Sequence, residues 1–237
     1  MMRKILLPII ASLFACSAEA PSARVAEAPD SVSGATSDNV PDVRAVEARA
    51  AVLFLGTSLT AGYGVGPDSA FPAVIAARID SAGLPFRVIN AGISGETSAG
   101  GLARLDWSLQ DSIAVLVLEL GANDGLRGLP VAQMRANLDT ILGRTRTRYP
   151  DVAIVIAGME APPNLGRAYT GEFRSTFREL ARDYDAALVP FLLEGVAAEP
   201  SLNQSDGIHP NAAGHRILAE HVWVTLAPIL EREAARR

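Results

Sequence analysis

Five segments of strand length, most of them apolar runs, alternate with segments of helical spacing over most of the chain, and this alternation constrains the fold more than any other feature. The strand-length segments occupy residues 51–56, 86–90, 113–120, 152–158 and 187–191. Continuous apolar runs are typical of parallel strands that are buried on both faces. Strands joined by helices predict a parallel sheet with helices on both faces, so we expect a three-layer α/β/α domain.

The segments between the runs have the spacing of helices that cover such a sheet. Helices are predicted over residues 69–81, 102–109, 130–149, 171–184 and 210–230. Pro130 and Pro210 suit the first turn of their helices, and the last helix is expected to end near Leu230. The folded domain is therefore predicted to span residues 50–231, with residues 232–237 as a frayed tail.

The start of the chain has the features of a secretory signal over residues 1–16. Arg3 and Lys4 precede an apolar stretch at residues 5–15, which is too short for a permanent transmembrane helix. The four residues that end at Cys16 resemble a bacterial lipoprotein box, in which this cysteine would be lipidated and would attach the protein to a membrane. The alternative is ordinary signal cleavage nearby. Both interpretations predict an exported protein. It would be periplasmic, anchored to a membrane as a lipoprotein, or secreted.

Residues 17–49 are rich in Ala, Pro, Ser, Asp and Glu and show no apolar periodicity. A segment of this composition cannot bury enough apolar surface to offset its chain entropy, so it is predicted to be a disordered tether. A coil of this length reaches on the order of 30 Å. It would hold the folded domain clear of a membrane.

Composition excludes several classes of partner and site. The net charge is −5 and no basic run is present apart from the scattered arginines of residues 144–148, so nucleic acid is not an expected partner. Aromatic residues make up only 5% of the chain, which argues against a stacking platform for bases or sugars. The single cysteine rules out an intramolecular disulfide and a cysteine-based zinc site. The sequence carries no signal of oligomeric state.

Four polar or glycine-containing stretches stand at the ends of the predicted strands. They occupy residues 56–59, 90–97, 121–125 and, just before the last helix, 206–210. The carboxyl ends of parallel strands meet at one edge of the sheet, and ligands bind outside that edge. We therefore expect these four stretches to converge on one site.

The residues in these stretches match the needs of acyl transfer by a serine. Such a reaction needs a nucleophile, a base, a group that orients the base, and donors for the tetrahedral oxyanion. Ser58 is the predicted nucleophile, His209 the base and Asp206 the group that holds the imidazole tautomer. The backbone N–H groups of Ser58 and Gly95 and the side-chain amide of Asn123 are predicted to form the oxyanion hole. This chemistry requires no metal and no cofactor.

Each stretch alone also has a structural interpretation. Residues 206–210 could simply start a helix, and residues 121–125 could form a tight turn. His215 and His221 fall within the last predicted helix as surface or packing residues, and Glu119 is a buried core carboxylate or, less strongly, a group that tunes the site. Four coincidences at four strand ends favour the catalytic interpretation.

The four stretches resemble blocks I, II, III and V of the SGNH hydrolases, also called the GDSL esterase family. The residues that name the family correspond to Ser58, Gly95, Asn123 and His209, and Asp206 corresponds to the acid of its catalytic triad. The resemblance implies a flavodoxin-like five-stranded sheet. It also implies a serine hydrolase that cleaves carboxylic esters or thioesters through an acyl-enzyme.

Within the family, residues 93–97, 119–128 and 206–211 are most similar to bacterial multifunctional acyl thioesterases, arylesterases and lysophospholipases. One departure is clear, because Thr57 replaces the aspartate of the Gly-Asp-Ser-Leu signature. Activity is expected to survive this change, since that aspartate is not the triad acid. An α/β-hydrolase fold is disfavoured, because Thr60 stands where the Gly-x-Ser-x-Gly elbow requires its second glycine.

The acyl group is predicted to bind between the loops near residues 126–130 and 159–165. The candidate lining residues are Leu126, Leu129, Met159 and Leu165, although all four could instead be packing residues. The expected substrates are small esters, thioesters or lysophospholipids. Two alternatives remain open, namely a carbohydrate acetylesterase on the same fold and a tethered binding domain without catalytic activity.

Overall fold

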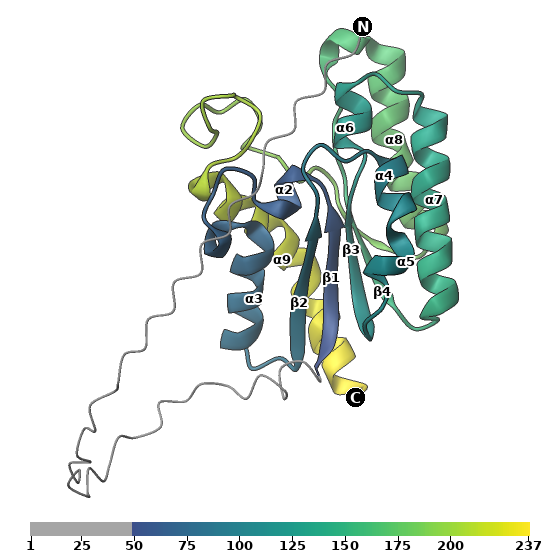
Figure 1. Ribbon diagram of the computed structural model, residues 1–237, viewed down its shortest axis with the longest axis vertical. Helices are drawn as coiled ribbons and strands as arrows, with labels where there is room; N and C mark the ends of the chain where they lie inside the picture. Colours follow the sequence, from purple (N-terminus) through teal and green to yellow (C-terminus); the bar gives the residue numbers. More distant parts are fainter. Residues whose placement is uncertain (1–48) are drawn as a thin grey trace, which may run out of the picture. The chain divides into compact units, whose positions relative to one another are not determined.

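Five parallel strands form the centre of the domain, in the order β2-β1-β3-β4-β5. The computed structural model describes residues 49–237, and all four neighbouring strand pairs are parallel (Figure 1). The strands are β1 (Ala50–Gly56), β2 (Phe86–Gly92), β3 (Ile113–Glu119), β4 (Ala153–Ala157) and β5 (Ala187–Val189). The prediction of a parallel five-stranded sheet is confirmed.

Helices cover both faces of this sheet, which completes the three predicted layers (Figure 1). One layer consists of α3 (Phe71–Ser81) and α9 (Ala212–Ala235). The other consists of α4 (Ser98–Ala103), α5 (Leu105–Ser108), α7 (Val131–Arg148) and α8 (Arg167–Asp183). Two short helices, α2 (Ser58–Ala61) and α6 (Ala122–Leu126), and two 3-10 turns, η1 (Pro67–Ser69) and η2 (Pro163–Leu165), lie in the connections.

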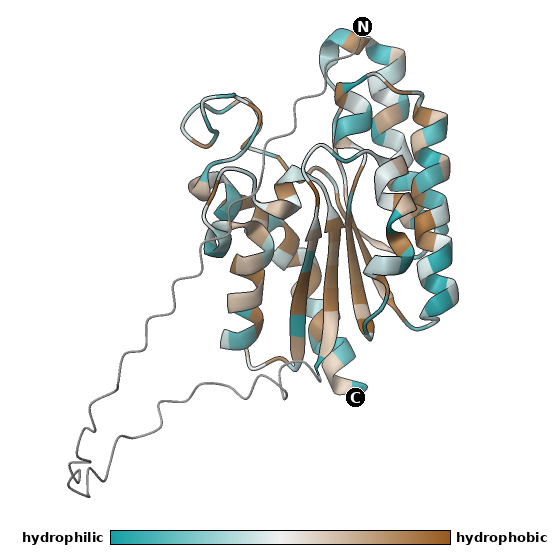
Figure 2. Ribbon diagram, viewed as in Figure 1, coloured by the Kyte–Doolittle hydropathy of each residue, from teal (hydrophilic) through white to brown (hydrophobic). Residues whose placement is uncertain are grey.

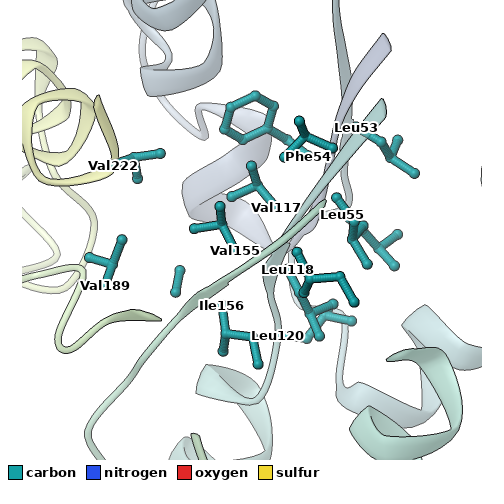
Figure 3. Close-up of a cluster of buried hydrophobic side chains, with 14 of the residues drawn as sticks. Leu53, Phe54, Leu55, Val117, Leu118, Leu120, Val155, Ile156, Val189 and Val222 are labelled. Atoms are coloured by element: carbon teal, nitrogen blue, oxygen red, sulfur yellow. The ribbon is translucent and has the colours of Figure 1, made fainter. Parts of the chain in front are cut away.

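The core consists of side chains that alternate between the two faces of the sheet. The strand register places Val117 beside Phe54 on one side and beside Val155 on the other, and all three point toward Val222 of α9 (Figure 3). The next row faces the opposite helix layer and consists of Leu55, Leu118 and Ile156. Figure 2 shows the apolar residues concentrated on the strands, with hydrophilic residues along the outer helices. Both sheet faces are therefore buried, as the continuous apolar runs predicted.

The last helix begins later than the sequence predicted. Pro210 does not open it, because α9 starts at Ala212 and Asn211 is its N-cap. The Asn211 side chain accepts hydrogen bonds from the N–H groups of Ala213 (2.9 Å) and Gly214 (3.1 Å). Asparagine is among the best N-cap residues, since its side-chain oxygen satisfies donors that have no partner within the helix. This leaves the Asp206 to Pro210 stretch outside the helix as a loop.

The same helix also ends later than predicted. Helical structure continues past Leu230 to Ala235, so the prediction of a frayed tail over residues 232–237 is wrong for most of its length. Glu233 is buried in spite of its charge, and it accepts a hydrogen bond from Arg236 (3.0 Å) one turn later. Packing of this face and the ion pair hold the last turn in place.

Three smaller boundaries also differ. The helix predicted over residues 102–109 is divided at Arg104 into α4 and α5. The helix predicted over residues 171–184 begins earlier, at Arg167. The last strand ends at Val189 because a proline follows it, and proline cannot donate a hydrogen bond to the sheet.

The predicted signal segment and most of the predicted tether (residues 1–48) lie outside the described residues. Cys16, the predicted lipidation site, lies there as well. Within residues 49–237, no helix is both long enough and apolar enough to cross a membrane.

His215 is buried in α9 and joins it to the start of α3. Its Nδ1 accepts a hydrogen bond from the N–H of Phe71 (3.3 Å), and the two rings stack. An accepting Nδ1 carries no proton, so this histidine is neutral. Burial, together with the nearby charge of His209, lowers the pKa of His215 to about 4. The histidine therefore serves packing, in agreement with one of the two predicted interpretations.

We predict that His215 makes the domain less stable in acid. Below a pH of about 6.5 the unfolded chain binds a proton that the folded state rejects until about pH 4, so the free energy of unfolding falls over this range by on the order of 3 kcal/mol. Urea unfolding across this range should show the loss. His215→Gln keeps an acceptor but cannot titrate, and its stability should fall less steeply. An equally steep fall in the variant would contradict the assignment.

Candidate active site

Three predicted residues from opposite ends of the sequence form one chain of hydrogen bonds. Ser58 Oγ lies 3.0 Å from His209 Nε2, and His209 Nδ1 lies 2.7 Å from Asp206 Oδ2. Ser58 is the first residue of α2, directly after β1, whereas the other two belong to the loop before α9. The parallel sheet brings both segments to the carboxyl edge of its strands, as the sequence predicted.

The loop that carries the imidazole also fixes its protonation. Asp206 Oδ1 accepts hydrogen bonds from the N–H groups of Ile208 and His209, both at 3.0 Å. Hydrogen bonds to the carboxylate lower the pKa of Asp206 to about 2. The backbone N–H of His209 contributes most, the His209 imidazole contributes next, and the backbone N–H of Ile208 follows. The carboxylate is therefore ionised and accepts the Nδ1 proton. This leaves Nε2 free to accept the Ser58 hydroxyl proton.

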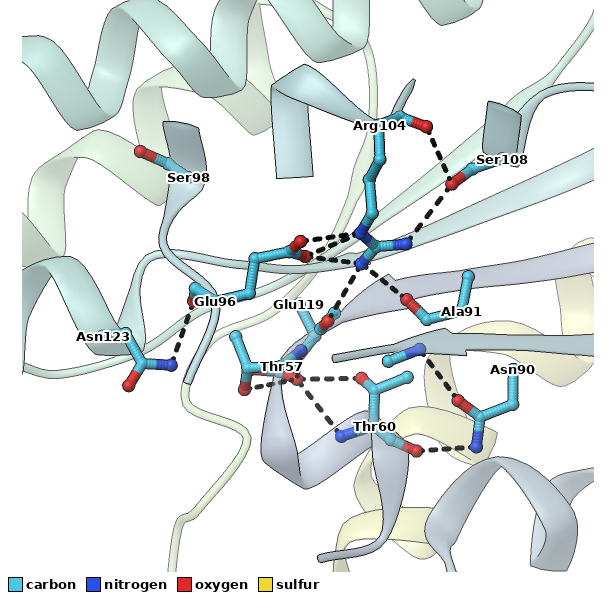
Figure 4. Close-up of polar contacts among 12 residues, drawn as sticks. Thr57, Thr60, Asn90, Ala91, Glu96, Ser98, Arg104, Ser108, Glu119 and Asn123 are labelled. Atoms are coloured by element: carbon cyan, nitrogen blue, oxygen red, sulfur yellow. Dashed lines mark hydrogen bonds and ion pairs between the residues drawn. The ribbon is translucent and has the colours of Figure 1, made fainter. Parts of the chain in front are cut away.

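The turn that presents Ser58 is anchored on the buried carboxylate of Glu119 (Figure 4). Glu119 Oε2 accepts hydrogen bonds from the N–H of Thr57 (2.8 Å), the hydroxyl of Thr60 (2.8 Å) and the N–H of Thr60 (3.3 Å). The Thr57 hydroxyl donates to Oε1 (2.9 Å). A methyl group at Gly56 would lie 2.7 Å from Oε2, so only glycine lets the carboxylate approach this closely.

These contacts define what Thr57 does in place of aspartate. Its hydroxyl donates to Glu119, so the residue before the nucleophile is tied to the end of β3. Burial raises the pKa of Glu119, and the hydrogen bonds from Thr57 and Thr60 oppose that rise. Glu119 is therefore a buried, hydrogen-bonded core carboxylate, as the first predicted interpretation has it, and its bonds also shape the turn that carries Ser58.

The three predicted oxyanion donors line the same cavity as Ser58. Gly95 has φ +78°, a conformation that suits glycine, and neither its N–H nor that of Ser58 has an acceptor among residues 49–237. Asn123 Nδ2 donates one hydrogen to the carbonyl of Glu96 (3.0 Å). A side-chain amide carries a second hydrogen, so Asn123 retains a donor for a ligand.

Two arginines that the sequence did not single out hold the loop that carries Gly95. Arg104 Nε lies 2.8 Å from one carboxylate oxygen of Glu96 and 2.9 Å from the other, and its Nη2 donates to the carbonyl of Ala91 (2.7 Å) (Figure 4). Arg127 donates to the carbonyl of Gly95 itself (2.7 Å). Bidentate arginine pairs fix geometry as well as charge. The Arg127 contact depends on how two loops meet, which spacing along the sequence does not reveal.

A third support joins the loops after β2 and β3. Asp124 is buried in α6, and its carboxylate accepts hydrogen bonds from the N–H (2.8 Å) and the hydroxyl (2.6 Å) of Ser98. Asn137 of α7 donates to the same hydroxyl (2.9 Å). The purely structural interpretation of residues 121–125 was a tight turn. These residues do more than that, because Asp124 connects the segment that carries Gly95 to the segment that carries Asn123.

A cavity of about 550 Å³ opens beside Ser58. Two of the four predicted lining residues, Leu126 and Met159, do line it, but Leu129 and Leu165 do not. Gly128 reverses the chain with φ +61°, and Leu165 packs near it and against the core. The cavity is lined by Thr57, Ser58, Leu59, Tyr63, Ser94, Gly95, Ala122, Asn123, Leu126, Met159, Glu160, Leu193, Ala197, Ala198, Gly207, Ile208 and His209.

The walls of this cavity are mainly apolar and include the polar groups of the site. The carboxylate residue that lines it, Glu160, forms an ion pair with Arg174 (2.9 Å). Within the described part of the chain, no three His, Cys, Asp or Glu side chains gather in a way that could hold a metal ion. The arrangement offers an activated hydroxyl, oxyanion donors and space for an apolar group.

We predict that the Thr57 hydroxyl stabilises the fold through Glu119. Thr57→Val keeps the shape but removes a donor from a buried carboxylate, which should lower the free energy of unfolding by about 1–3 kcal/mol. Urea unfolding measures this, and Thr57→Ser should lose less. Thr140→Val removes an exposed hydroxyl from α7 and should change stability by less than about 0.5 kcal/mol. Equal effects at positions 57 and 140 would show that the buried bond contributes nothing.

Comparison with known proteins identifies the family. The model of the GDSL-like lipase/acylhydrolase family matches residues 54–217. Esterase TesA from Pseudomonas aeruginosa is 41% identical over 180 residues, which cover 76% of this chain and 89% of that protein. Thioesterase 1/protease 1/lysophospholipase L1 from Escherichia coli K12 is 35% identical over 184 residues, which cover 77% of this chain and 86% of that protein.

The fold agrees with this assignment. The crystal structure of TesA matches with a TM-score of 0.72 at 40% identity, over 76% of this chain and 99% of the other. The family model, which matches residues 54–217, covers all four of the motif stretches. The chain therefore belongs to the GDSL-like lipase/acylhydrolase family, the family that its motif stretches resemble.

Proposed function

We propose that this protein is a serine hydrolase that cleaves carboxylic esters or thioesters. The observation that carries the proposal is the hydrogen-bonded chain from Ser58 through His209 to Asp206, beside a mainly apolar cavity. Relatives named as an esterase and as a thioesterase and lysophospholipase support the same class of reaction.

Acylation begins with the Ser58 hydroxyl. Its oxygen attacks the acyl carbonyl carbon while His209 Nε2 takes the hydroxyl proton across the 3.0 Å contact. Asp206 stabilises the imidazolium that forms, because its ionised carboxylate already accepts the Nδ1 proton. The tetrahedral intermediate then expels the alcohol or thiol, which leaves with the proton from His209, and an acyl-serine remains.

The negative charge of the tetrahedral intermediate falls on the former carbonyl oxygen. The N–H groups of Ser58 and Gly95 and the second hydrogen of the Asn123 amide are the donors available to it. Deacylation repeats these steps with water. His209 takes a proton from the water, the hydroxide attacks the acyl carbon, and Ser58 leaves with that proton as the free hydroxyl.

The cavity favours an acyl group larger than acetyl. Leu59, Met159 and Leu193 form apolar walls, and apolar walls stabilise an alkyl or aryl group by removing it from water. We propose aryl esters, short-to-medium acyl esters, thioesters and lysophospholipids as the substrate class. Export of the protein would favour lysophospholipids or external esters over cytosolic acyl thioesters.

We further propose that the protein is exported and held at a membrane through lipidated Cys16. The basic start, the short apolar stretch and the lipoprotein-like box support this proposal. Cys16→Ala should move the protein from the membrane fraction to the soluble fraction of cells that make it. An unchanged distribution would leave ordinary signal cleavage as the better explanation.

We predict that turnover of a short p-nitrophenyl ester depends on these groups. Ser58→Ala should nearly abolish it, because no other group would form the acyl intermediate. Asn123→Ala should lower kcat by about 10²–10³ through the loss of one oxyanion donor. Steady-state kinetics measure both, and a fluorophosphonate probe should label the wild-type protein at Ser58. Substantial turnover by Ser58→Ala would refute the assignment.

The same assay distinguishes the substrate classes. Wild-type protein is compared on p-nitrophenyl esters of increasing acyl length, acyl thioesters, lysophospholipids and acetylated sugars. The apolar cavity predicts higher kcat/KM for acyl groups longer than acetyl. Fastest turnover of acetylated sugars would instead support the carbohydrate acetylesterase, and no turnover of any of them would support the binding domain.

A further inference from the structure

The nucleophile and its base come from segments that no strand pairing joins. Ser58 follows β1, and His209 belongs to the irregular connection between β5 and α9. Their contact of 3.0 Å must therefore be set by other interactions. A displacement of about 1 Å between reacting groups is enough to cost on the order of 10² in rate. Whatever holds the two segments together acts on catalysis.

One side chain, that of Gln204, bonds to both segments. Its Nε2 donates to the carbonyl of Tyr63 (2.7 Å), on the nucleophile side, and to the carbonyl of Pro210 (3.0 Å), on the base side. An amide NH₂ has two hydrogens, so one serves each segment. The backbone N–H of Gln204 donates to the carbonyl of His209 (2.7 Å).

Tyr63 carries this link to the nucleophile itself. Its N–H donates to the carbonyl of Ser58 (3.0 Å), and its ring lies against the imidazole of His209 with centroids 4.7 Å apart. The contacts thus form a closed circuit that runs from Ser58 through Tyr63 and Gln204 to His209, and back through the catalytic hydrogen bond. Because the contacts form a closed circuit, the bonds through Tyr63 and Gln204 restrict the distance between Ser58 and His209.

The chain makes room for the Gln204 side chain at Gly64. A methyl group there would lie 2.1 Å from Gln204 Oε1 and would push the amide away from its partners. Gln204 does not line the catalytic cavity, so it does not contact an acyl group bound there. Its hydrogen bonds therefore connect the two catalytic segments outside the cavity.

We propose that Gln204 is a positioning residue that sets the distance between Ser58 and His209. The proposal rests on the proposed hydrolase function. Without the two amide donors, the loop that carries His209 would lose its bond to the nucleophile segment. Asp206 would still hold the imidazole, because both belong to the same loop. The loss would therefore fall on the Ser58 to His209 contact.

The test compares two variants. Gln204→Met keeps the length of the side chain and removes its donors. Gln204→Glu keeps the shape but is ionised at neutral pH, so it offers no donor to the carbonyl of Tyr63 or of Pro210. In both we expect kcat on a p-nitrophenyl ester to fall by about 10- to 100-fold, with KM within about twofold of wild type. Labelling of Ser58 by a fluorophosphonate should slow in parallel. Gln110→Met replaces an exposed glutamine away from the site and should leave all values unchanged.

A second readout separates positioning from a general loss of structure. His209 must protonate an alkoxide leaving group, whereas p-nitrophenolate leaves without a proton. Gln204→Met should therefore lose several-fold more kcat on an alkyl ester than on the p-nitrophenyl ester of the same acid. A protein that is partly unfolded would lose both activities by the same factor. Urea unfolding provides the independent measure of stability.

Several outcomes would overturn the proposal. One is a folded Gln204→Met or Gln204→Glu protein with kcat within about twofold of wild type. Another is an equal loss on the two kinds of ester, and a third is loss of cooperative unfolding in both variants, which would make Gln204 a purely structural residue. Failure of the proposed function looks different, because wild-type protein would then hydrolyse none of the esters.

Discussion

The buried carboxylate of Glu119 is the constraint on which the rest of the site depends. A carboxylate that is buried away from solvent must find donors within the protein, and among residues 49–237 those donors come from Thr57 and Thr60. The end of β3 thereby dictates the shape of the turn after β1, and Ser58 lies inside that turn. Glycine at position 56 is required by the same contact. A polar core interaction therefore fixes the turn that carries the nucleophile, in addition to the hydrogen bonds of Ser58 itself.

The loops that carry Gly95, Asn123 and His209 reach the same edge of the sheet as Ser58 because the parallel strands end there. That shared edge alone would leave these loops free to move. Buried or partly buried polar contacts remove that freedom. Arg104 holds the loop of Gly95 through Glu96, and Asp124 joins that loop to the segment of Asn123. The first contact lies within the connection between β2 and β3, and the second joins that connection to the one after β3. The sheet supplies the arrangement, and the polar contacts supply the precision that catalysis needs.

The sequence predicted the groups that act, and it missed most of the groups that hold them. Ser58 and His209 could be found because acyl transfer demands these residue types and strand ends are recognisable in a sequence. Glu119 and Thr57 are 62 positions apart, and nothing local indicates that they meet. Leu129 was misplaced for a related reason, since the direction of the chain after Gly128 depends on a backbone angle that the pattern of apolar residues does not encode.

Thr57 shows how a departure from a family motif can keep its geometry and change its electrostatics. An aspartate in its place would bring a second carboxyl group against Glu119, and two carboxyl groups in contact cannot both ionise, so one would hold a proton. The threonine hydroxyl donates the same kind of hydrogen bond without a titratable group. The turn beside Ser58 therefore contains one buried acid, and its hydrogen bonds do not depend on a proton shared between two carboxyl groups. The nucleophile keeps its place with one titratable group fewer beside it.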